Sequence, residues 1–155
     1  EKIAGYADDA ALLADIDSVV ATCCAIKARI VEQDEFDTGL RMLLNFGHTL
    51  GHAVEQHFGY SCFTHGEGVA IGMYQLTKRT EELGMTAKGS AERIKSVLEK
   101  YNLPLTAGVE KAQLLDTMAR DKKKNGNSIT LIILQQIGEG VLQKVDWQEV
   151  PKYLG

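Results

Sequence analysis

Glycine recurs within the helix-like stretches of one short part of the chain, from Arg41 to Met73, with the sequence RMLLNFGHTLGHAVEQHFGYSCFTHGEGVAIGM. Each glycine in a helix costs about 1 kcal/mol of helix propensity relative to alanine. A helix that accepts several such costs needs close approach by the backbone of another helix or by a ligand. The sequence therefore favours a fold in which these helices lie directly against the backbone of another helix or against a ligand. The glycines concerned are Gly47, Gly51, Gly66, Gly68 and Gly72.

The rest of the chain also has mainly helical periodicity. From Asp15 or Asp17, apolar residues recur at intervals of three and four as far as Val31, which predicts a helix with one buried stripe. The polar run EQDEFDTG is expected to end it, and DKKKNGN predicts a turn-like loop. SITLIILQQIGEGVLQKV predicts two short strands, with a short helix after Asp146. The other expected helices are residues 48–57, 65–83, 90–101 and 110–120.

Composition limits the class of partner. The 155 residues carry a formal net charge of −4, with 45% hydrophobic and 25% charged residues. This balance suits one globular domain and argues against nucleic acid or an anionic membrane as partner, since both require a basic face. Neither a run of about 18 apolar residues nor a signal peptide is recognisable. Cys23 and Cys24 lie in an apolar helical run and are expected in the core, so reduced thiols favour a cytoplasmic location. The start at Glu1, without Met, indicates a fragment.

All four histidines fall within this glycine-rich part of the chain, at His48, His52, His57 and His65. Two histidines four residues apart on a helix share one face, with Cβ atoms about 5–6 Å apart. Such a pair can share one divalent cation such as Zn²⁺, or divide into a ligand and an acid/base group. The alternative is that His48 and His52 are partly buried, hydrogen-bonded residues, but clustering with glycines favours a metal-dependent active site.

The surroundings of the histidines narrow these roles. Thr49 stands where the zincin motif requires glutamate, which disfavours metallopeptidase chemistry. His57, at a helix end, is expected to interact with the helix dipole. Glu55 can join the cluster, although a solvated helix face explains it equally well. Gly66 and Gly68, at a helix start, leave amide donors accessible to an anion.

Cationic and amide side chains precede the histidines. If the helix extends back far enough, Arg41 and Asn45 share the face of His48 and His52, which suits a hydroxylated or phosphorylated substrate. Arg41 can equally pair with Asp34 or Asp37 as a surface ion pair. Lys27 is expected to be solvated when taken alone. The run from Arg120 to Lys124 is either a solvated loop or a phosphate clamp.

Longer motifs identify a family. RMLLNFGHTLGHAVE followed by THGEGVAIGM resembles the signature of 3-dehydroquinate synthase, and KARIVEQDEFDTGLR and ARDKKKNGNSITLIILQQIG resemble its flanking segments. The resemblance covers nearly the whole chain but only the C-terminal half of that enzyme. It implies a mainly α fold, residues 1–155 being one helical domain with a small two-stranded β-hairpin near the C-terminus. The N-terminal, Rossmann-like NAD-binding domain, and a segment that carries a glutamate metal ligand, are then absent.

The resemblance also implies roles for individual residues. His48 and His65 would be metal ligands, and His52 would transfer protons instead of binding the metal. Lys27 and Asp37 are further candidates for catalysis, although the family usually has glutamate at the latter position, and the shorter side chain weakens an acid/base role. The residues expected to bind the substrate's carboxylate, hydroxyls and phosphate, in addition to His48 and His65, are Lys27, Arg41, Asn45 and one of Lys122 and Lys123.

The implied reaction converts 3-deoxy-D-arabino-heptulosonate 7-phosphate to 3-dehydroquinate and phosphate, with Zn²⁺ or Co²⁺ and NAD as cofactors in a homodimer. A related sugar-phosphate cyclase, such as 2-deoxy-scyllo-inosose synthase, is the nearest alternative. Glycerol dehydrogenase relatives share the architecture without the LNFGH and HGE motifs. Alone, the chain is expected to be inactive, and as an isolated module it would bind metal weakly or dimerise.

Overall fold

The computed structural model describes residues 2–36 and 39–154, with the side chains of residues 120–125 left undescribed. Its elements, with η for 3₁₀ helices, are η1 (Ile3–Gly5), α1 (Asp9–Ala14), α2 (Ile16–Gln33), η2 (Leu40–Asn45), α3 (His48–His57), α4 (His65–Glu82), α5 (Ser90–Lys100), α6 (Lys111–Asn125), β1 (Ser128–Gln136), β2 (Glu139–Asp146) and η3 (Val150–Tyr153). The predicted mainly helical fold with a C-terminal hairpin is therefore confirmed.

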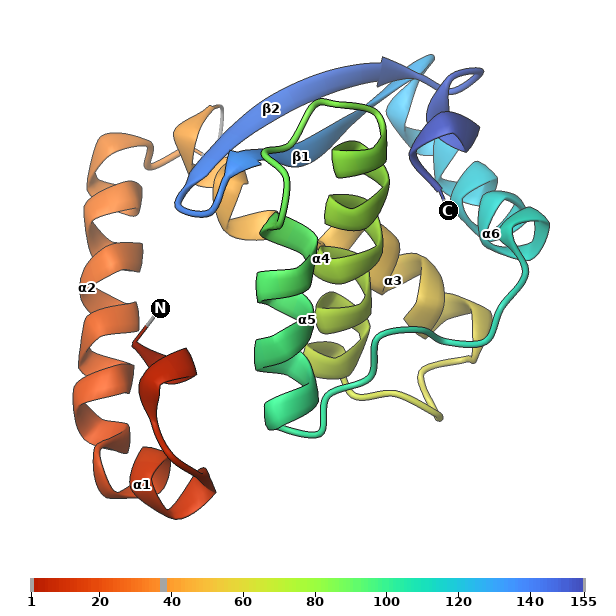
Figure 1. Cartoon of the computed structure of the whole chain (residues 1–155). Coiled ribbons are helices and arrows are strands. Elements are labelled where there is room, and N and C mark those ends of the chain that lie inside the picture. Colours follow the sequence, from red (N-terminus) through yellow and green to blue (C-terminus); the bar gives the residue numbers. More distant parts are fainter. Residues whose placement is uncertain (1, 37–38, 155) are drawn as a thin grey trace.

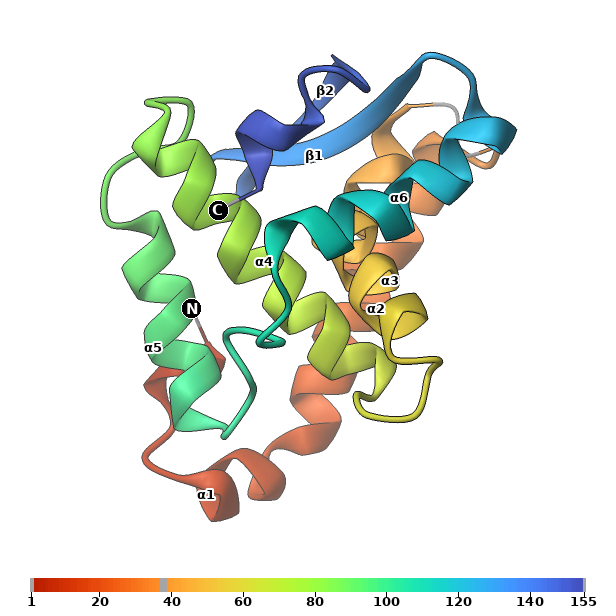
Figure 2. The same cartoon turned by 90° about the vertical axis from the view of Figure 1, so that its right-hand side faces the viewer.

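Helices α3 and α4 cross at the centre of the molecule, with α5 beside α4 and α6 beside α3 (Figures 1 and 2). The antiparallel hairpin β1–β2 lies across one end of this group, in a register that pairs Ser128 with Asp146. Helices α1 and α2 stand to one side, and α2 contacts the rest mainly through η2. The N-terminal segment is held against the end of α5, where the Tyr101 hydroxyl donates to the Ile3 carbonyl (2.6 Å).

The hydrophobic core lies between α3, α4, α6, the hairpin and the C-terminal turn. Burial of these side chains is the main force that holds the elements together, at about 25 cal/mol per Å² of apolar surface. The buried cluster consists of Leu50, Ala53, Leu76, Met118, Leu131, Ile133, Val145, Val150 and Leu154.

The crossing of α3 and α4 depends on glycine. A Cβ atom added to Gly72 would lie 2.0 Å from the carbonyl oxygen of Gly47, and one added to Gly51 would lie 2.9 Å from the carbonyl carbon of Gly68. Gly47 itself has a φ of +83°, which L-residues with side chains rarely adopt. The prediction of close backbone approach is confirmed, and at these positions the approaching group is another helix.

Local signals fix the helix ends. At the start of α4, Thr64 and Glu67 form a capping box in which the Thr64 side chain accepts from the Glu67 N–H while Glu67 Oε2 accepts from the Thr64 N–H. The first turn of α5 is capped by Glu81, whose carboxylate accepts the backbone N–H groups of Gly89 (2.8 Å) and Ala91 (2.9 Å). These hydrogen bonds hold the pKa of Glu81 below its ordinary value.

Several sequence-based expectations are wrong. α6 continues through the lysine-rich run and ends only before Gly126, because lysine is a good helix former and no breaker intervenes. The apolar stripe of α2 is not buried: Val20 is 53% and Ile26 43% exposed, because periodicity shows only that a face could pack. Cys23 and Cys24 are exposed instead of in the core. The final helix is a 3₁₀ turn that begins at Val150.

The described residues include no helix that is both long enough and apolar enough to cross a membrane.

Replacement of Gly72 by alanine should weaken the fold, since its methyl group would overlap the backbone of Gly47. We expect the free energy of unfolding in urea to fall by about 1–3 kcal/mol or more. Gly66→Ala is the matched control, because no atom lies within 4 Å of the added Cβ. It should leave stability unchanged or raise it by up to about 1 kcal/mol. Equal stability of the two variants would contradict this account of the crossing.

Replacement of Glu81 by glutamine should change how stability depends on pH. The lowered pKa of Glu81 means that its ionised form stabilises the folded chain above the ordinary glutamate value of 4.5. That contribution is lost as the pH falls through the lowered pKa of the folded state. We expect Glu81→Gln to be less stable at neutral pH and to lose less further stability on acidification, measured by thermal unfolding. Parallel pH profiles would argue against this cap.

Candidate metal centre

Three histidines converge where α3 and α4 cross. His48 is the first residue of α3, His52 lies one turn later, and His65 is the first residue of α4. Their ring centroids are 5.5 Å (His48 to His52), 5.0 Å (His48 to His65) and 5.6 Å (His52 to His65) apart. The tight crossing thus brings the beginning of α4 against the first turns of α3.

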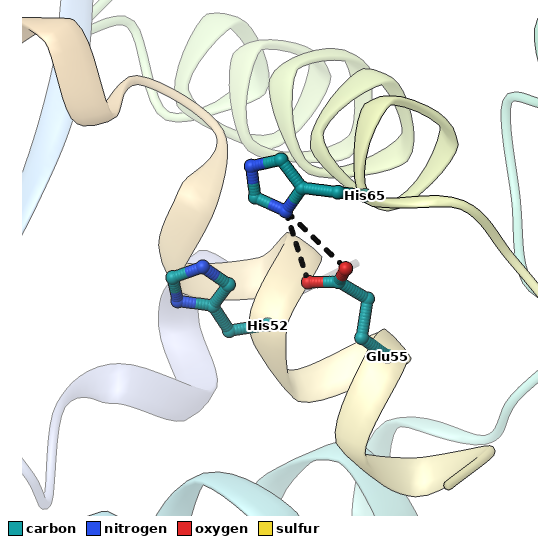
Figure 3. A group of neighbouring side chains, drawn as sticks. All are labelled: His52, Glu55 and His65. Carbon is teal, nitrogen blue, oxygen red and sulfur yellow. Dashed lines mark hydrogen bonds and ion pairs between the residues drawn. The ribbon is translucent and has the colours of Figure 1, made fainter. Parts of the chain in front are cut away.

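Glu55 completes the cluster from the next turn of α3. Figure 3 shows its carboxylate pointing towards His65, with His52 to the left of it. The two carboxylate oxygens lie 3.2 and 3.3 Å from His65 Nδ1, and Glu55 is only 6% exposed. The sequence left this residue between two interpretations, and the structure places it inside the cluster. The sequence did contain a signal for this placement: Glu55 follows His52 by three residues, a spacing that puts both side chains on one face of a helix.

The histidines differ in how their rings are held. His48 Nδ1 lies 3.3 Å from the Phe46 carbonyl oxygen, which can only accept a hydrogen bond. His65 Nδ1 likewise faces the Glu55 carboxylate. When either ring is neutral, its proton therefore belongs on Nδ1, and Nε2 carries the lone pair. His52 has no hydrogen-bond partner among the described residues.

These donor groups suit a divalent metal ion. Imidazole nitrogens and carboxylate oxygens bind Zn²⁺ at about 2.0–2.2 Å. One ligand atom each from His52, Glu55 and His65 lies within 4.8 Å of the others. His48 contributes no atom to this set, although its ring is nearer to the His65 ring than the His52 ring is. His52 and His65 are exposed, so one side of the cluster is open to solvent.

A cleft of about 480 Å³ opens beside His52. It is bounded by α3 on one side and by α6 and the start of β1 on the other. This size lies within the range of small-molecule sites. The lining residues are Met42, Thr49, His52, Ala53, Gln56, Met118, Ser128, Ile129, Thr130 and Trp147. Lys122 and Lys123 stand in sequence between two lining residues, within the last turns of α6, but their side chains lie outside the described residues.

The other described residues that the sequence predicted for the site make no hydrogen bond to the histidine cluster. α3 begins at His48, so the proposed continuous helix from Arg41 does not form, because Gly47 turns the chain. The Arg41 guanidinium donates to the Glu35 carbonyl (2.8 Å). Asn45 ends η2 and is exposed. Lys27 is exposed on α2, with no hydrogen bond to the histidines in the described part of the chain.

Two further predictions concern residues outside the cluster. Asp37 lies outside the described residues. His57, in the last turn of α3, packs its ring edge-on against Phe58, with centroids 5.0 Å apart, and does not join the other histidines.

Known structures resemble this fold. A 2-deoxy-scyllo-inosose synthase, solved with carbaglucose-6-phosphate, NAD⁺ and Co²⁺, superposes with a TM-score of 0.73 at 19% identity, over 90% of this chain and 40% of the other. A 2-epi-5-epi-valiolone synthase from Streptomyces hygroscopicus, with NAD⁺ and Zn²⁺ bound, gives a TM-score of 0.70 at 20% identity, over 93% and 39%. At such identities the likeness establishes the fold alone.

Sequence comparison is more specific. The 3-dehydroquinate synthase of Clostridium acetobutylicum is 44% identical over 99% of this chain, and that of Enterococcus faecalis is 36% identical over 99%. The chain spans 44% and 43% of these relatives, less than half of their length. Residues 6–124, which include every residue of the histidine cluster, match the family described as 3-dehydroquinate synthase C-terminal, and it is to this family that the chain belongs.

Proposed function

We propose that the chain is the metal-binding part of an enzyme that converts 3-deoxy-D-arabino-heptulosonate 7-phosphate to 3-dehydroquinate and phosphate. The observation that carries this proposal is the convergence of His48, His52 and His65 beside an open cleft, in a chain of this family. The reaction is that of its relatives, which are more than twice as long. The complete enzyme is therefore the molecule to which the activity is assigned.

We assign the metal to His48 and His65, with a third ligand, a glutamate, from outside this chain. Metal-binding histidines usually donate the N–H of the other ring nitrogen to a carboxylate or a backbone carbonyl. Both rings have such a partner at Nδ1, Phe46 for the first and Glu55 for the second. His52, Glu55 and His65 form an alternative set of ligands by distance, but the His52 ring has no such partner among the described residues. A bound Zn²⁺ or Co²⁺ would act as a Lewis acid on a substrate oxygen.

His52 is assigned to proton transfer. Imidazole is suited to this task near neutral pH, and this ring lines the cleft and is exposed. Because no described residue is hydrogen-bonded to this ring, both of its nitrogens are free to form and break hydrogen bonds as a proton moves. The metal ligands, by contrast, must keep their orientation.

Cationic groups are assigned to the substrate's charges. Arg41 and Asn45 precede the cluster directly in η2, and Lys122 and Lys123 follow the cleft-lining Met118 in the last turns of α6. Such groups would orient a carboxylate and a phosphate and balance their charge. Lys27, on α2, and Asp37 remain predictions. NAD would supply the transient oxidation of the substrate and is expected to be held mainly by a nucleotide-binding domain.

A second candidate is another sugar-phosphate cyclase, because the solved structures with this fold include a 2-deoxy-scyllo-inosose synthase. The sequence relatives favour dehydroquinate formation. A module that binds metal or forms a dimer without catalysis is the expectation for the isolated chain. The free Cys23, Cys24 and Cys62 accord with the expected cytoplasmic location.

Turnover by the enzyme expressed from the complete gene should distinguish the candidates. With NAD⁺ and Zn²⁺ present, we expect phosphate release from heptulosonate phosphate and not from glucose 6-phosphate. Release from glucose 6-phosphate alone would replace our proposal with the second candidate. Residues 1–155 alone should release no phosphate, and activity of this chain by itself would show that the site is complete without further segments.

Single histidine variants of the complete enzyme should separate ligand from proton-transfer roles. We expect His48→Ala to lose zinc and turnover together, because it removes a ligand. His52→Ala should retain zinc, measured by metal analysis after gel filtration, while kcat falls about 10²–10⁴-fold. His57→Ala is the matched control and should alter neither quantity. Loss of zinc from His52→Ala with retention in His48→Ala would reverse the assignment.

A further inference from the structure

Glu55 is the one ionisable side chain among the buried residues that the structure describes. A buried carboxylate is costly unless hydrogen bonds or an opposite charge compensate for its lost hydration. No described buried polar side-chain atom is left without a partner, and among the described residues the Glu55 carboxylate has His65 as its hydrogen-bond partner. Burial of the Glu55 carboxylate therefore costs folding free energy, and in the described part of the chain His65 is the side chain that offsets this cost.

The helix crossing is shaped to admit this side chain. A Cβ atom on Gly68 would lie 3.2 Å from Glu55 Cγ and 3.2 Å from the Gly51 carbonyl oxygen. Gly68 thus leaves space both for the approach of the two backbones and for the stem of Glu55. Even the Cβ of an alanine at position 68 would therefore make a tight contact with Glu55, which would have to shift slightly to accommodate it.

Within this space the carboxylate meets one particular nitrogen. Both oxygens lie almost equally far from His65 Nδ1, at 3.2 and 3.3 Å, so the N–H points between them. In Figure 3 the other ring nitrogen of His65 lies on the opposite side, away from Glu55. The contact therefore selects the tautomer with the proton on Nδ1 and fixes the direction in which Nε2 can bind.

We infer that Glu55 is a positioning residue, which holds the exposed His65 ring so that its Nε2 is ready for the metal. This inference rests on the proposed function and deepens it. His65 is the first residue of α4, and its side chain is 56% exposed, so little packing restrains the ring. Without Glu55 the His65 ring would also populate other rotamers and the other tautomer. Metal binding would then have to restrict the ring to one of them, which weakens the affinity. Loss of such a partner typically costs 10–100-fold in metal affinity.

The rival interpretation is that Glu55 binds the metal directly, together with His52 and His65. The two roles predict different effects of an isosteric change. A positioning residue needs only an acceptor for the Nδ1 proton, which the amide oxygen of glutamine supplies. A ligand needs the anionic oxygen, which glutamine lacks.

The test measures zinc affinity of the complete enzyme by chelator competition, with wild type, Glu55→Ala, Glu55→Gln and His65→Ala. We expect about 10–100-fold weaker binding for Glu55→Ala. Glu55→Gln should stay close to wild type, and its Co²⁺ form should keep the wild-type visible absorption spectrum. Glu81→Gln is the control for a merely structural effect. It removes the charge of the carboxylate that caps α5, near the opposite end of α4 from His65, so stability should fall while zinc affinity stays unchanged.

A second measurement is independent of bound metal. The ¹⁵N shifts of the His65 ring should show the proton on Nδ1 in the metal-free wild type and in Glu55→Gln, and a mixture of tautomers in Glu55→Ala. Unchanged zinc affinity or an unchanged tautomer in Glu55→Ala would overturn the inference. Loss of zinc from Glu55→Gln as complete as from His65→Ala would make Glu55 a ligand instead. Failure of the wild type to bind zinc would refute the proposed function, while the ring shifts would still decide whether Glu55 sets the tautomer.

Discussion

The site depends on the backbone contact between α3 and α4. Helices that meet through ordinary side chains pack with axes about 8–10 Å apart, which leaves room for side chains between them. Here Gly47, Gly51, Gly68 and Gly72 remove that layer, and a methyl group on Gly72 would lie 2.0 Å from the Gly47 carbonyl oxygen. Close packing of backbone on backbone fixes the offset of the two helices more firmly than flexible side chains would. The separations of the imidazoles follow from that offset.

The same crossing creates and resolves an electrostatic problem. Glu55 is buried because it lies on the face of α3 that meets α4, and its charge requires a donor inside the crossing. The donor comes from His65, which the crossing has already placed there. The fold and the candidate site therefore share one hydrogen bond: the imidazole compensates the buried carboxylate, and the carboxylate orients the imidazole.

The sequence was informative where local signals dominate. Gly47 and Gly59 bracket α3, and the predicted bounds of that helix and the need for a close helix contact are confirmed. Burial was harder to predict, because it depends on which surface another element covers. The apolar stripe of α2 is exposed although its periodicity is regular, and Glu55 is buried although a charged residue on a polar helix face is usually solvated. The exposure of α2 and the burial of Glu55 both depend on where other helices lie, which the sequence of a single helix does not reveal.

The structure adds a distinction that spacing could not make. His48 and His52 share a helix face, and as a pair four residues apart they look equivalent. The hydrogen bonds make them different: Phe46 restrains the ring of His48, Glu55 restrains that of His65, and no described residue restrains that of His52. A metal ligand benefits from a fixed ring because reordering would weaken binding, whereas a group that accepts and returns protons must exchange partners. Two restrained rings and one unrestrained ring, each about 5 to 6 Å from the others, therefore support a division into two ligands and one acid/base group.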